Sequence, residues 1–500
     1  MRFERSCGIL LHPTSFPGDF GIGDIGPQAH KWIDFLSKAG CGLWQVLPLG
    51  PTGYGDSPYQ SFSAFAGNPY LISPESLLEE GLIHSNDLVD LPEFPSEKVD
   101  FGAVISWKTG LLDRAFIQFQ HLNSRSLHLD FEEFQVKHSF WLPDFALFMA
   151  LKEAYGGGSW VNWPSPLLNR DPSSIDQARD SHSIAILRQE FRQFIFYRQW
   201  ESLRQHANNE EILIIGDIPI FVAHDSSDVW AHPELFYLDE KGDPTVVAGV
   251  PPDYFSKTGQ LWGNPLYRWD IHQADGYGWW LKRLSAVLEF VDIVRLDHFR
   301  GFAGYWEVPF GNKTAVDGRW VAGPGQDFFA EVEKSLGHLP IIAEDLGVIT
   351  PDVTEMRRRF NLPGMRIIQF AFNGDPKDPF LPHNHELDSV IYTGTHDNDT
   401  SRGWYERVPE NDKSFYRRYL NTDGNDVSWD FIRAAWGSVS IFALAPLQDF
   451  LSLGNEARMN YPGNASGNWI WRMPANALSE SLQERIKQIN FLYDRGIRDG

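Results

Sequence analysis

The chain has 500 residues, of which 42% are hydrophobic and 22% are charged, as in an ordinary globular protein with ample material for a core. Its 43 Lys and Arg residues against 66 Asp and Glu residues give a formal charge of −23, which would repel a phosphate backbone and argues against a nucleic-acid partner. This length would suggest about three domains of ~150 residues, but α/β barrels run to ~250 residues or more as one domain.

Cysteine content and the chain start bear on the compartment. Cys7 and Cys41 are the only cysteines, which argues against a disulfide framework or a zinc-thiolate site and fits a reducing environment. The first six residues lack the apolar stretch of a secretory signal, and no run approaches the ~18 apolar residues of a membrane span. We predict a cytoplasmic protein with no membrane partner.

Short apolar runs that end in polar, Gly or Pro residues recur along the chain and predict eight strands. In chain order they are Cys7–His12, Leu43–Leu49, Ile212–Asp217, Phe290–Asp297, Pro340–Glu344, Met365–Phe372, Ser389–His396 and Ser440–Gln448. Several lack alternation of apolar and polar residues, which is typical of parallel strands covered on both faces.

Helical patterns separate many of these runs. Gln28–Ala39, Trp279–Glu289 and Asp327–Leu336 each show apolar residues at helical spacing or helix boundary signals. Eight strands alternating with helices predict an α/β fold, the (β/α)8 TIM barrel, with its active site at the carboxyl ends of the strands. We expect residues 1–500 to form a single catalytic barrel domain.

Two intervals are too long for plain connections and predict large helical and loop insertions around the C-terminal face of the barrel. Residues 50–211, between strands two and three, contain several helical patterns, including Phe140–Lys152 and Ser181–Arg204. We expect the last of these helices to belong to the barrel and the others to pack around its mouth. Residues 221–278 are rich in Pro, Gly and aromatic residues with little periodicity, which predicts a lid or substrate-binding segment after strand three.

Aromatic residues are abundant, at 14% with 19 Trp. A large aromatic core accounts for most of them. Others lie in polar segments rich in Gly and Pro, such as Trp262 in Gln260-Leu261-Trp262-Gly263-Asn264-Pro265. Flat aromatic faces outside a core suit ligands with apolar C–H faces and polar rims, and sugars have that shape.

Acidic residues end several predicted strands in nearly apolar surroundings. They are Asp297 in Val294–Phe299, Glu344 in Ile341–Gly347, Asp397 in Tyr392–Asp399, and Asp217 in Ile214–Pro219. Burial of an unpaired carboxylate is costly, so one such acid usually marks a structural salt bridge. Three or four acids that converge on one barrel face predict a catalytic cluster.

The neighbours of two acids suggest different charge states. Arg295 precedes Asp297 by two positions, which in a strand places both side chains on one face, where the guanidinium would favour ionised Asp297. Glu344 follows three apolar residues, whose desolvation would raise its pKa toward that of a general acid. Such a pair suits glycosidic bond cleavage. His298 and His396 could hydrogen-bond sugar hydroxyls, although a structural hydrogen bond is an equal alternative for each.

At this point the sequence closely resembles the amylomaltases, or 4-α-glucanotransferases (disproportionating enzymes), relatives of the α-amylases. The match spans nearly the whole chain. It is carried by Leu11–Ser15, Trp44–Leu49, Gly53–Tyr59, Gly216–Phe221, Ala248–Phe255, Arg295–Phe299, Ala343–Gly347, Gly394–Asp399 and Ser466–Trp469.

The resemblance implies a retaining double displacement on α-1,4-glucans, with no cofactor. Asp297 matches the family nucleophile, Glu344 the acid/base, and Asp397 the third acid, which distorts and stabilises the reacting sugar. The residues that match sugar-binding positions are Arg295, His298, His396, Tyr59, Asp217, Asn468, Trp262 and the lid residues Asp253, Tyr254 and Phe255. For Tyr59 and Asn468 a loop-closing hydrogen bond is the alternative. Tyr54 and Phe101 could bind glucan away from the centre, although ordinary packing is the better interpretation for Phe101.

The implied donors are maltooligosaccharides and α-1,4-glucans derived from starch or glycogen, with glucose or another glucan as acceptor. Related amylases carry an Asn-His pair after the Asp of the third strand, whereas this chain reads Asp217-Ile218-Pro219-Ile220-Phe221-Val222-Ala223-His224, so an amylase-type calcium is not supported. Composition does not separate transfer from hydrolysis. Transfer requires that the site exclude water and raise the effective concentration of a sugar hydroxyl, as an aromatic lid could do.

Three other functions remain alternatives. One is an α-glucan hydrolase of the amylase type. Another is a metal-dependent barrel hydrolase using His12, His298 and His396, although the chain has no His-x-His or His-Glu-x-x-His pattern, and we predict no metal. The third is a non-catalytic glucan-binding protein, which would not need both Asp297 and Glu344.

Overall fold

The computed structural model describes residues 3–252, 256–464 and 466–496. Within them eight strands close into a barrel in the order β1-β12-β11-β10-β9-β6-β3-β2, and neighbouring strands pair in parallel. The barrel strands are β1 (Ser6–Leu10), β2 (Leu43–Gln45), β3 (Leu213–Ile218), β6 (Ile293–Leu296), β9 (Ile341–Ala343), β10 (Gly364–Ile367), β11 (Ser389–Tyr392) and β12 (Phe442–Pro446). Each overlaps one predicted run, so the predicted (β/α)8 barrel is confirmed.

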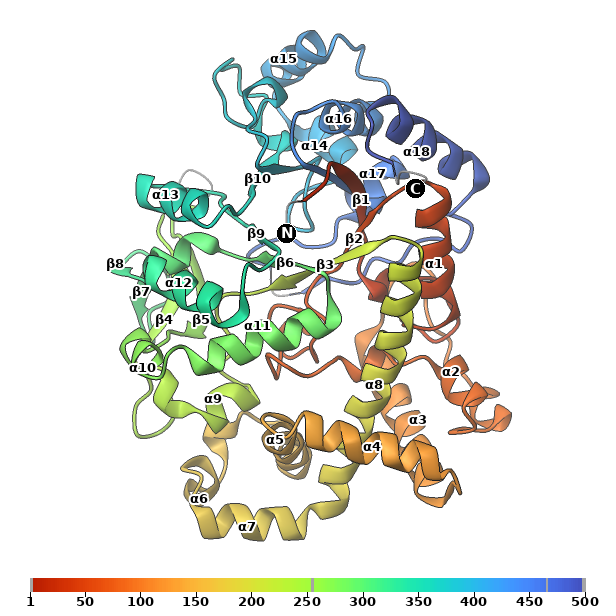
Figure 1. Ribbon diagram of the computed structural model, residues 1–500, viewed down its shortest axis with the longest axis vertical. Coiled ribbons are helices and arrows are strands. Elements are labelled where there is room, and N and C mark those ends of the chain that lie inside the picture. Colours follow the sequence, from red (N-terminus) through yellow and green to blue (C-terminus); the bar gives the residue numbers. More distant parts are fainter. Residues whose placement is uncertain (1–2, 253–255, 465, 497–500) are drawn as a thin grey trace.

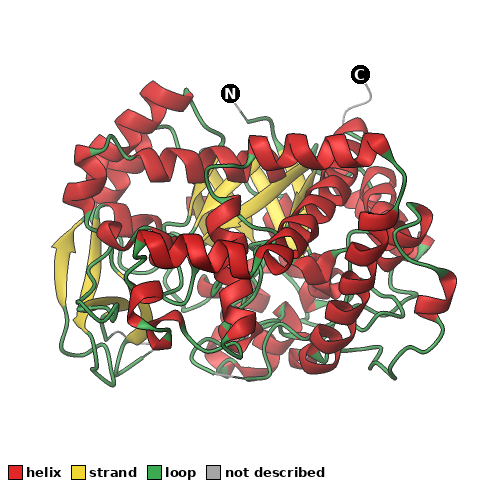
Figure 2. Ribbon diagram, turned by 90° about the horizontal axis from the view of Figure 1, so that it is seen from below, coloured by secondary structure: helices red, strands yellow, loops and turns green. Residues whose placement is uncertain are grey.

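Helices cover the outside of this barrel (Figure 2). They include α1 (Pro27–Lys38), α8 (Ser183–Asn209), α11 (Gly278–Phe290), α12 (Gly325–Leu336), α13 (Pro351–Arg359), α16 (Val427–Trp436) and α18 (Glu480–Leu492). The sequence predicted α1, α11 and α12 to within two residues at each end. In α1, Pro27 occupies the first turn, where its missing N–H leaves no hydrogen bond unmade, and Ala29, Trp32, Ile33 and Leu36 are buried at helical spacing.

The barrel interior is filled by side chains that alternate along the strands. One buried cluster takes Ile215, Ile293, Ile342 and their neighbours from the barrel strands and no residue from a covering helix. Because side chains in a strand alternate between its faces, the residues two positions later also point inward, one layer nearer the carboxyl ends. Those residues are Asp217, Arg295 and Glu344. The apolar lower layer thus supports a charged upper layer.

The interval between β2 and β3 is largely helical. It contains α2 (Pro74–Glu79), α3 (Phe101–His121), α4 (Arg125–Lys137), α5 (Leu142–Ala154), α6 (Ser165–Leu168), α7 (Pro172–Ser181) and α8. In Figure 1, α4 to α7 lie at the lower end of the molecule, and the long α8 runs from them toward the barrel, where it contacts β3. The prediction that the insertions and the barrel make one domain stays a prediction.

A four-stranded antiparallel sheet lies beside the barrel and was not predicted. Its order is β5-β4-β7-β8, and it lies at one side of the molecule in Figures 1 and 2. The strands are β4 (Val246–Val250), β5 (Gln260–Pro265), β7 (Gly304–Pro309) and β8 (Arg319–Ala322). The interval 221–278 therefore supplies two strands, whereas the sequence indicated only a lid. The strands are short, and the second partner of β4, β7, lies some 60 residues away along the chain.

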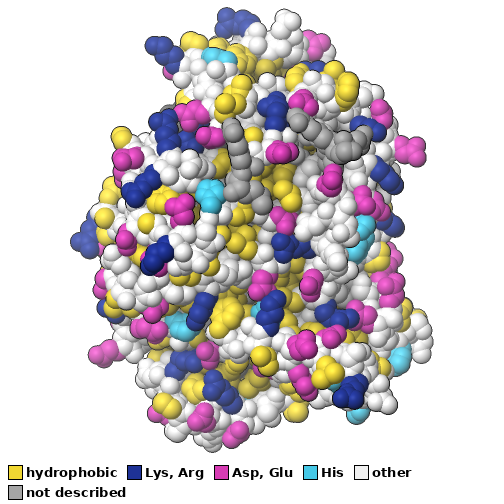
Figure 3. All heavy atoms as spheres, viewed as in Figure 1, with side chains coloured by type: hydrophobic (Ala, Val, Ile, Leu, Met, Phe, Trp, Pro, Cys, Tyr) yellow, Lys and Arg dark blue, Asp and Glu magenta, His cyan; other side chains and the backbone are white. Residues whose placement is uncertain are grey.

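The remaining α-helices are short or lie in the later connections. They are α9 (Ser227–Ala231), α10 (Trp269–Ala274), α14 (Ser401–Arg407), α15 (Glu410–Leu420) and α17 (Leu447–Phe450). In the described part of the chain, no helix is long and apolar enough to cross a membrane. On the face drawn in Figure 3, acidic and basic side chains are interspersed rather than gathered by sign.

Replacement of Trp280 by Ala should strongly destabilise the fold. Trp280 on α11 is fully buried and its ring contacts those of Tyr267, Phe302 and Phe328, so truncation leaves a large cavity. We expect a loss of about 3–5 kcal/mol in the free energy of unfolding, measured by urea denaturation. Val136→Ala on α4, where the side chain is 76% exposed, is the control and should change it by less than ~0.5 kcal/mol. Equal effects would contradict this packing.

Candidate active site

Arg295 joins two carboxylates inside the upper end of the barrel. Its Nη1 lies 2.6 Å from Asp217 Oδ2 on β3 and 2.8 Å from Asp297 Oδ1 at the end of β6. The predicted placement of Arg295 and Asp297 on one face is therefore confirmed. The Arg295 side chain is 5% exposed, Asp217 is fully buried and Asp297 is 29% exposed. Asp297 is thus the acid of this group that a ligand in the barrel mouth can reach.

Asp217 is held by two donors yet keeps one oxygen free. Besides Arg295, the Tyr59 hydroxyl donates to its Oδ2 at 2.8 Å. Burial raises the pKa of Asp217 to about 6, although the Arg295 charge opposes this. Its Oδ1 has no hydrogen-bond partner among the described residues. Because a buried oxygen without a donor is costly, Asp217 is suited to accept a hydrogen bond from a bound ligand.

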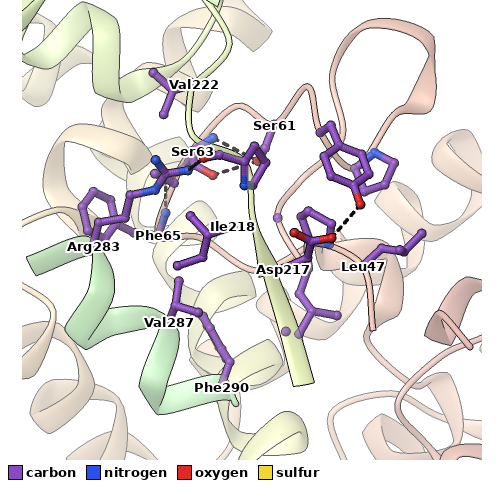
Figure 4. A pocket seen from close by; sticks show the side chains of 18 of the residues that line it. Leu47, Ser61, Ser63, Phe65, Asp217, Ile218, Val222, Arg283, Val287 and Phe290 are labelled. Carbon is purple, nitrogen blue, oxygen red and sulfur yellow. Dashed lines mark hydrogen bonds between the residues drawn. The ribbon is translucent and has the colours of Figure 1, made fainter. Parts of the chain in front are cut away.

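A small cavity adjoins Asp217 and Tyr59 but is not a sugar site. Its volume is about 80 Å³, whereas pockets for small molecules usually measure ~300–1,000 Å³. Figure 4 shows Asp217 at one end and Arg283 of α11 at the other, with apolar Ile218 and Val287 between them. The cavity can hold little more than water, so it is too small for the sugar chain that the sequence predicts as ligand.

Glu344 directly follows β9, the strand beside β6. Because Leu296 pairs with Ala343 in parallel register, the next residues along, Asp297 and Glu344, lie side by side at the ends of neighbouring strands, and alternation directs both side chains inward. Strands are spaced about 4.8 Å apart, close to the separation of about 5–5.5 Å between the two carboxyls of retaining glycosidases. The register therefore predicts, from the strand spacing alone, a carboxyl separation of the size that a covalent displacement needs.

Two backbone donors fix the Glu344 side chain. The His298 amide donates to Oε2 at 2.7 Å and the Leu346 amide to Oε1 at 3.0 Å. Burial and the nearby negative charge of Asp297 raise the pKa of Glu344 to about 8, against the opposing effects of Arg295 and these amides. The desolvation predicted from Ile341-Ile342-Ala343 is therefore confirmed as the main cause. At neutral pH, Glu344 carries a proton that it can donate.

His298 makes the turn that connects the two acids. It adopts the left-handed conformation, with φ 50° and ψ 48°, which is uncommon for a residue other than glycine and often marks a functional site. This conformation turns its backbone N–H toward Glu344. Burial lowers the pKa of the His298 ring to about 4, so the ring is neutral. It meets the Trp262 ring edge-on at 4.8 Å between centroids, which places Trp262 beside the same acids.

Asp397 lies in the loop that follows β11. Asn460 Nδ2 donates to its Oδ1 at 2.6 Å, and His396 Nε2 lies 3.3 Å from its Oδ2. Although burial opposes ionisation, His396 and Asn460 hold the pKa of Asp397 below its ordinary value. Its side chain is 47% exposed. A charged, accessible carboxylate of this kind is suited to accept hydrogen bonds from a pair of sugar hydroxyls.

An aromatic stack joins Asp397 to the Asp217 group. The Tyr59 ring lies on His396 at 5.1 Å with 22° between planes, and the Trp469 ring contacts both. Tyr59 therefore has two contacts: its hydroxyl binds Asp217 and its ring supports the histidine that binds Asp397. Arg295, Asp217, Tyr59, His396 and Asp397 thus form one connected group.

The remaining residues that were predicted to contact sugar differ in their surroundings. Both ends of the Asn468 amide are used within its own loop, by the Tyr461 amide and the Asn464 carbonyl, which is the loop-closing alternative. Tyr54 is 78% exposed, whereas Phe101 is buried at 8%, as ordinary packing requires. Asp253, Tyr254 and Phe255 lie outside the described residues.

Two residues near the acids were missed by the sequence analysis. Asn460 and Arg458 hold Asp397, the latter by donating from Nη2 to its backbone oxygen at 2.6 Å. They come from a connection after β12, some 60 residues away from Asp397, and no local pattern marks them.

His12, just after β1, is buried, and its Nδ1 has no partner among the described residues. Burial lowers the pKa of His12 to about 3, so it contributes a neutral ring.

Comparison with known proteins decides the family. A family profile described as 4-alpha-glucanotransferase matches residues 11–478. The chain belongs to the 4-alpha-glucanotransferase family. It is 50% identical over 495 residues to the 4-alpha-glucanotransferase of Thermus thermophilus, covering 97% of this chain and 98% of that protein. It is 49% identical over 498 residues to the one from Synechocystis sp., covering 99% of each.

Solved structures agree with this membership. The amylomaltase from Streptococcus agalactiae in complex with acarbose superposes with a TM-score of 0.96 at 38% identity, covering 99% of this chain and all of that one. The amylomaltase from Corynebacterium glutamicum, at 17% identity and a TM-score of 0.81, covers 97% of this chain and 75% of that one and shares the fold. The resemblance and the enzyme class predicted from the sequence are confirmed.

The proton on Glu344 predicts an alkaline limit for this glucanotransferase. The pKa of about 8 lies above the ordinary carboxyl value, so the protonated acid predominates at neutral pH and is lost as the pH rises through that value. We expect kcat/KM for maltotriose to fall about tenfold per pH unit above it. A glycosyl fluoride, whose fluoride leaves without a proton, should lack this decline. The same decline with both donors would show that another group causes it.

Replacement of Arg295 should destabilise the protein in a pH-dependent way. Arg295→Met leaves Asp217 buried without its cation, at a cost of about 3–5 kcal/mol at pH 7.5. The pKa of Asp217 is already raised to about 6 and rises further without Arg295, so at pH 5 the acid is neutral and the loss should be smaller. Urea denaturation at both pH values measures the difference. The control is the double variant Arg295→Met with Asp217→Asn, which should recover part of the lost free energy of unfolding at pH 7.5. An equal loss of free energy of unfolding at pH 5 and pH 7.5 in Arg295→Met would contradict the prediction.

Proposed function

We propose that the protein cleaves an α-1,4-glucan and transfers the donor segment to the 4-hydroxyl of glucose or another glucan. The observation that carries this proposal is the register of β6 and β9, which sets Asp297 and Glu344 side by side with unlike surroundings. Arg295 lies against the first acid, while burial keeps a proton on the second. Two carboxyls at this spacing with these roles suit a retaining double displacement.

In the first half of the reaction, Glu344 donates its proton to the glycosidic oxygen as Asp297 attacks the anomeric carbon. The bond to the leaving sugar breaks, and a glycosyl ester of Asp297 forms. Arg295 compensates the negative charge of Asp297 before attack and stays paired with Asp217 through Nη1 when that charge is consumed. Asp397 and Asp217 hold hydroxyls of the reacting sugar.

In the second half, Glu344 is a carboxylate and acts as the base. It takes the proton from the 4-hydroxyl of the acceptor, whose oxygen attacks the anomeric carbon and releases Asp297 with overall retention. Water competes with the acceptor at this step, so transfer requires that sugar bind well enough to exclude it. Trp262, packed against His298, provides an aromatic surface beside the acids for that purpose.

The substrates belong to the same proposal. Relatives named 4-alpha-glucanotransferase and an amylomaltase holding acarbose support maltooligosaccharides and starch- or glycogen-derived α-1,4-glucans as donors. Glucose and shorter glucans are the acceptors. A cytoplasmic location remains a prediction.

Incubation with maltotriose alone tests the proposal. Disproportionation should give glucose and a ladder of longer maltooligosaccharides, separated by chromatography, whereas glucose and maltose alone would indicate hydrolysis. Glu344→Gln should lower turnover of maltotriose by at least ~10²-fold, as loss of a general acid does, while a glycosyl fluoride donor remains able to glycosylate Asp297. Asp345→Asn is not a suitable control because Asp345 is buried against Arg357. Glu355→Gln, at an exposed position of α13, is the matched control and should keep wild-type turnover. Wild-type turnover by Glu344→Gln would refute the assigned acid.

A further inference from the structure

Trp320 on β8 is a large aromatic side chain held on the surface. It is 44% exposed, which is unusual for a residue that buries most of its area in folded proteins. Other exposed apolar side chains lie on the same sheet or the segments that adjoin it: Leu261 at 38%, Phe310 at 50%, Val316 at 48% and Val348 at 62%. Apolar side chains that gather at one surface mark interaction sites more often than isolated ones do.

Two contacts fix the Trp320 ring. The guanidinium of Arg300 lies over it at 3.9 Å from the centroid. The ring of Trp306, its partner in the pairing of β7 with β8, meets it at 5.3 Å with 69° between planes. One face of the indole is therefore covered by a planar cation, and the exposed area belongs to the rest of the ring. A ring already fixed in this way loses little conformational entropy when a ligand stacks on it.

Arg300 is an unusual support for this ring. It is 8% exposed, yet no carboxylate of the described residues lies within ion-pair distance of it, and its Nε has no partner there. Asp352 acts on its charge only from farther away, and burial lowers the pKa of Arg300. A buried cation without a close anion is costly. Residues that lower the stability of the fold in this way are more typical of functional sites than of parts with a purely structural role.

The Trp320–Arg300 pair is connected to both catalytic loops. Arg300 belongs to the turn η7 (Phe299–Phe302), two residues after His298, and its Nη1 donates to the Val348 carbonyl, four residues after Glu344. Trp262, which contacts His298, lies on β5 at the opposite edge of the same sheet. Along the sheet Trp320 pairs with Trp306, Trp306 with Gly249, and Gly249 with Leu261. Exposed Leu261, rather than its neighbour Trp262, therefore shares the face of Trp320, and three strand spacings of about 4.8 Å, about 14 Å, separate β5 from β8.

We propose that the free face of Trp320, backed by Arg300, is an outlying stacking platform for linear α-1,4-glucan chains that extend beyond the catalytic cleft. The inference rests on the proposed function, because the ligand class is that of its donors and acceptors. Flat C–H faces of glucosyl units stack on the indole, and the platform adds affinity by linkage to the cleft, since both sites hold one chain. Short donors such as maltotriose do not reach it.

The test compares KM values for short and long donors. Trp320→Ala and Trp320→Leu should raise KM for maltoheptaose or short amylose by about threefold to tenfold, the value of one aromatic contact. KM and kcat for maltotriose should stay within about twofold of the wild-type values. Trp320→Tyr, which keeps an aromatic ring, should have a KM for maltoheptaose close to that of the wild-type protein. The control is Phe491→Ala on α18, where the aromatic ring is 84% exposed and no cation of the described residues lies over it. This variant should leave KM unchanged for both maltotriose and maltoheptaose.

Each other outcome overturns the inference. An equal rise in KM for maltotriose and maltoheptaose in Trp320→Ala and Trp320→Leu would mean that the ring acts only through Arg300 on the catalytic loops. Unchanged KM for both substrates would mean that glucan does not touch the ring. Absence of transfer by the wild-type protein would instead defeat the proposed function, so the two failures are distinguishable.

Discussion

A single buried guanidinium organises the charged layer of this barrel. Arg295 reaches Asp217 on one neighbouring strand and Asp297 at the end of its own strand. Asp217 has no bulk water to stabilise its charge, and Asp297 is only partly exposed. Without that cation, two negative charges would face each other and a third acid, Glu344, in a low-dielectric interior, which burial and like-charge repulsion strongly disfavour. The other features of the site follow from this arrangement.

The unlike states of Asp297 and Glu344 arise from their different partners. Asp297 has the guanidinium, whereas Glu344 has two backbone amides and the nearby negative charge of Asp297. Amides stabilise a carboxylate less than a full charge does, so burial dominates at Glu344 and a proton stays on it. One strand spacing thus separates the acid that we propose as nucleophile from the acid that we propose as proton donor.

Parts outside the barrel complete the site from several directions. Tyr59 comes from the long interval after β2, Trp262 from the antiparallel sheet, and Asn460 from the connection after β12. Each contacts a residue at a strand end: Asp217, His298 and Asp397, respectively. The barrel therefore provides the rigid acids, and the insertions provide the aromatic and amide groups around them. The same sheet carries the proposed platform at Trp320, so one sheet, built from the connections before and after β6, serves both the reacting bond and the chain beyond it.

Local sequence determined the eight strands, several helices and the acids at the strand ends. Short apolar runs bounded by polar residues are set by burial on both faces, and the two-residue period alone placed Arg295 and Asp297 on one side. The apolar residues before Glu344 were likewise enough to predict a raised pKa. Tertiary structure decided what depends on distant segments: the pairing of β4 with β7, the His298 amide on Glu344, Asn460 on Asp397 and Arg300 on Trp320. No local period encodes such contacts, because their partners are brought together only when the barrel closes.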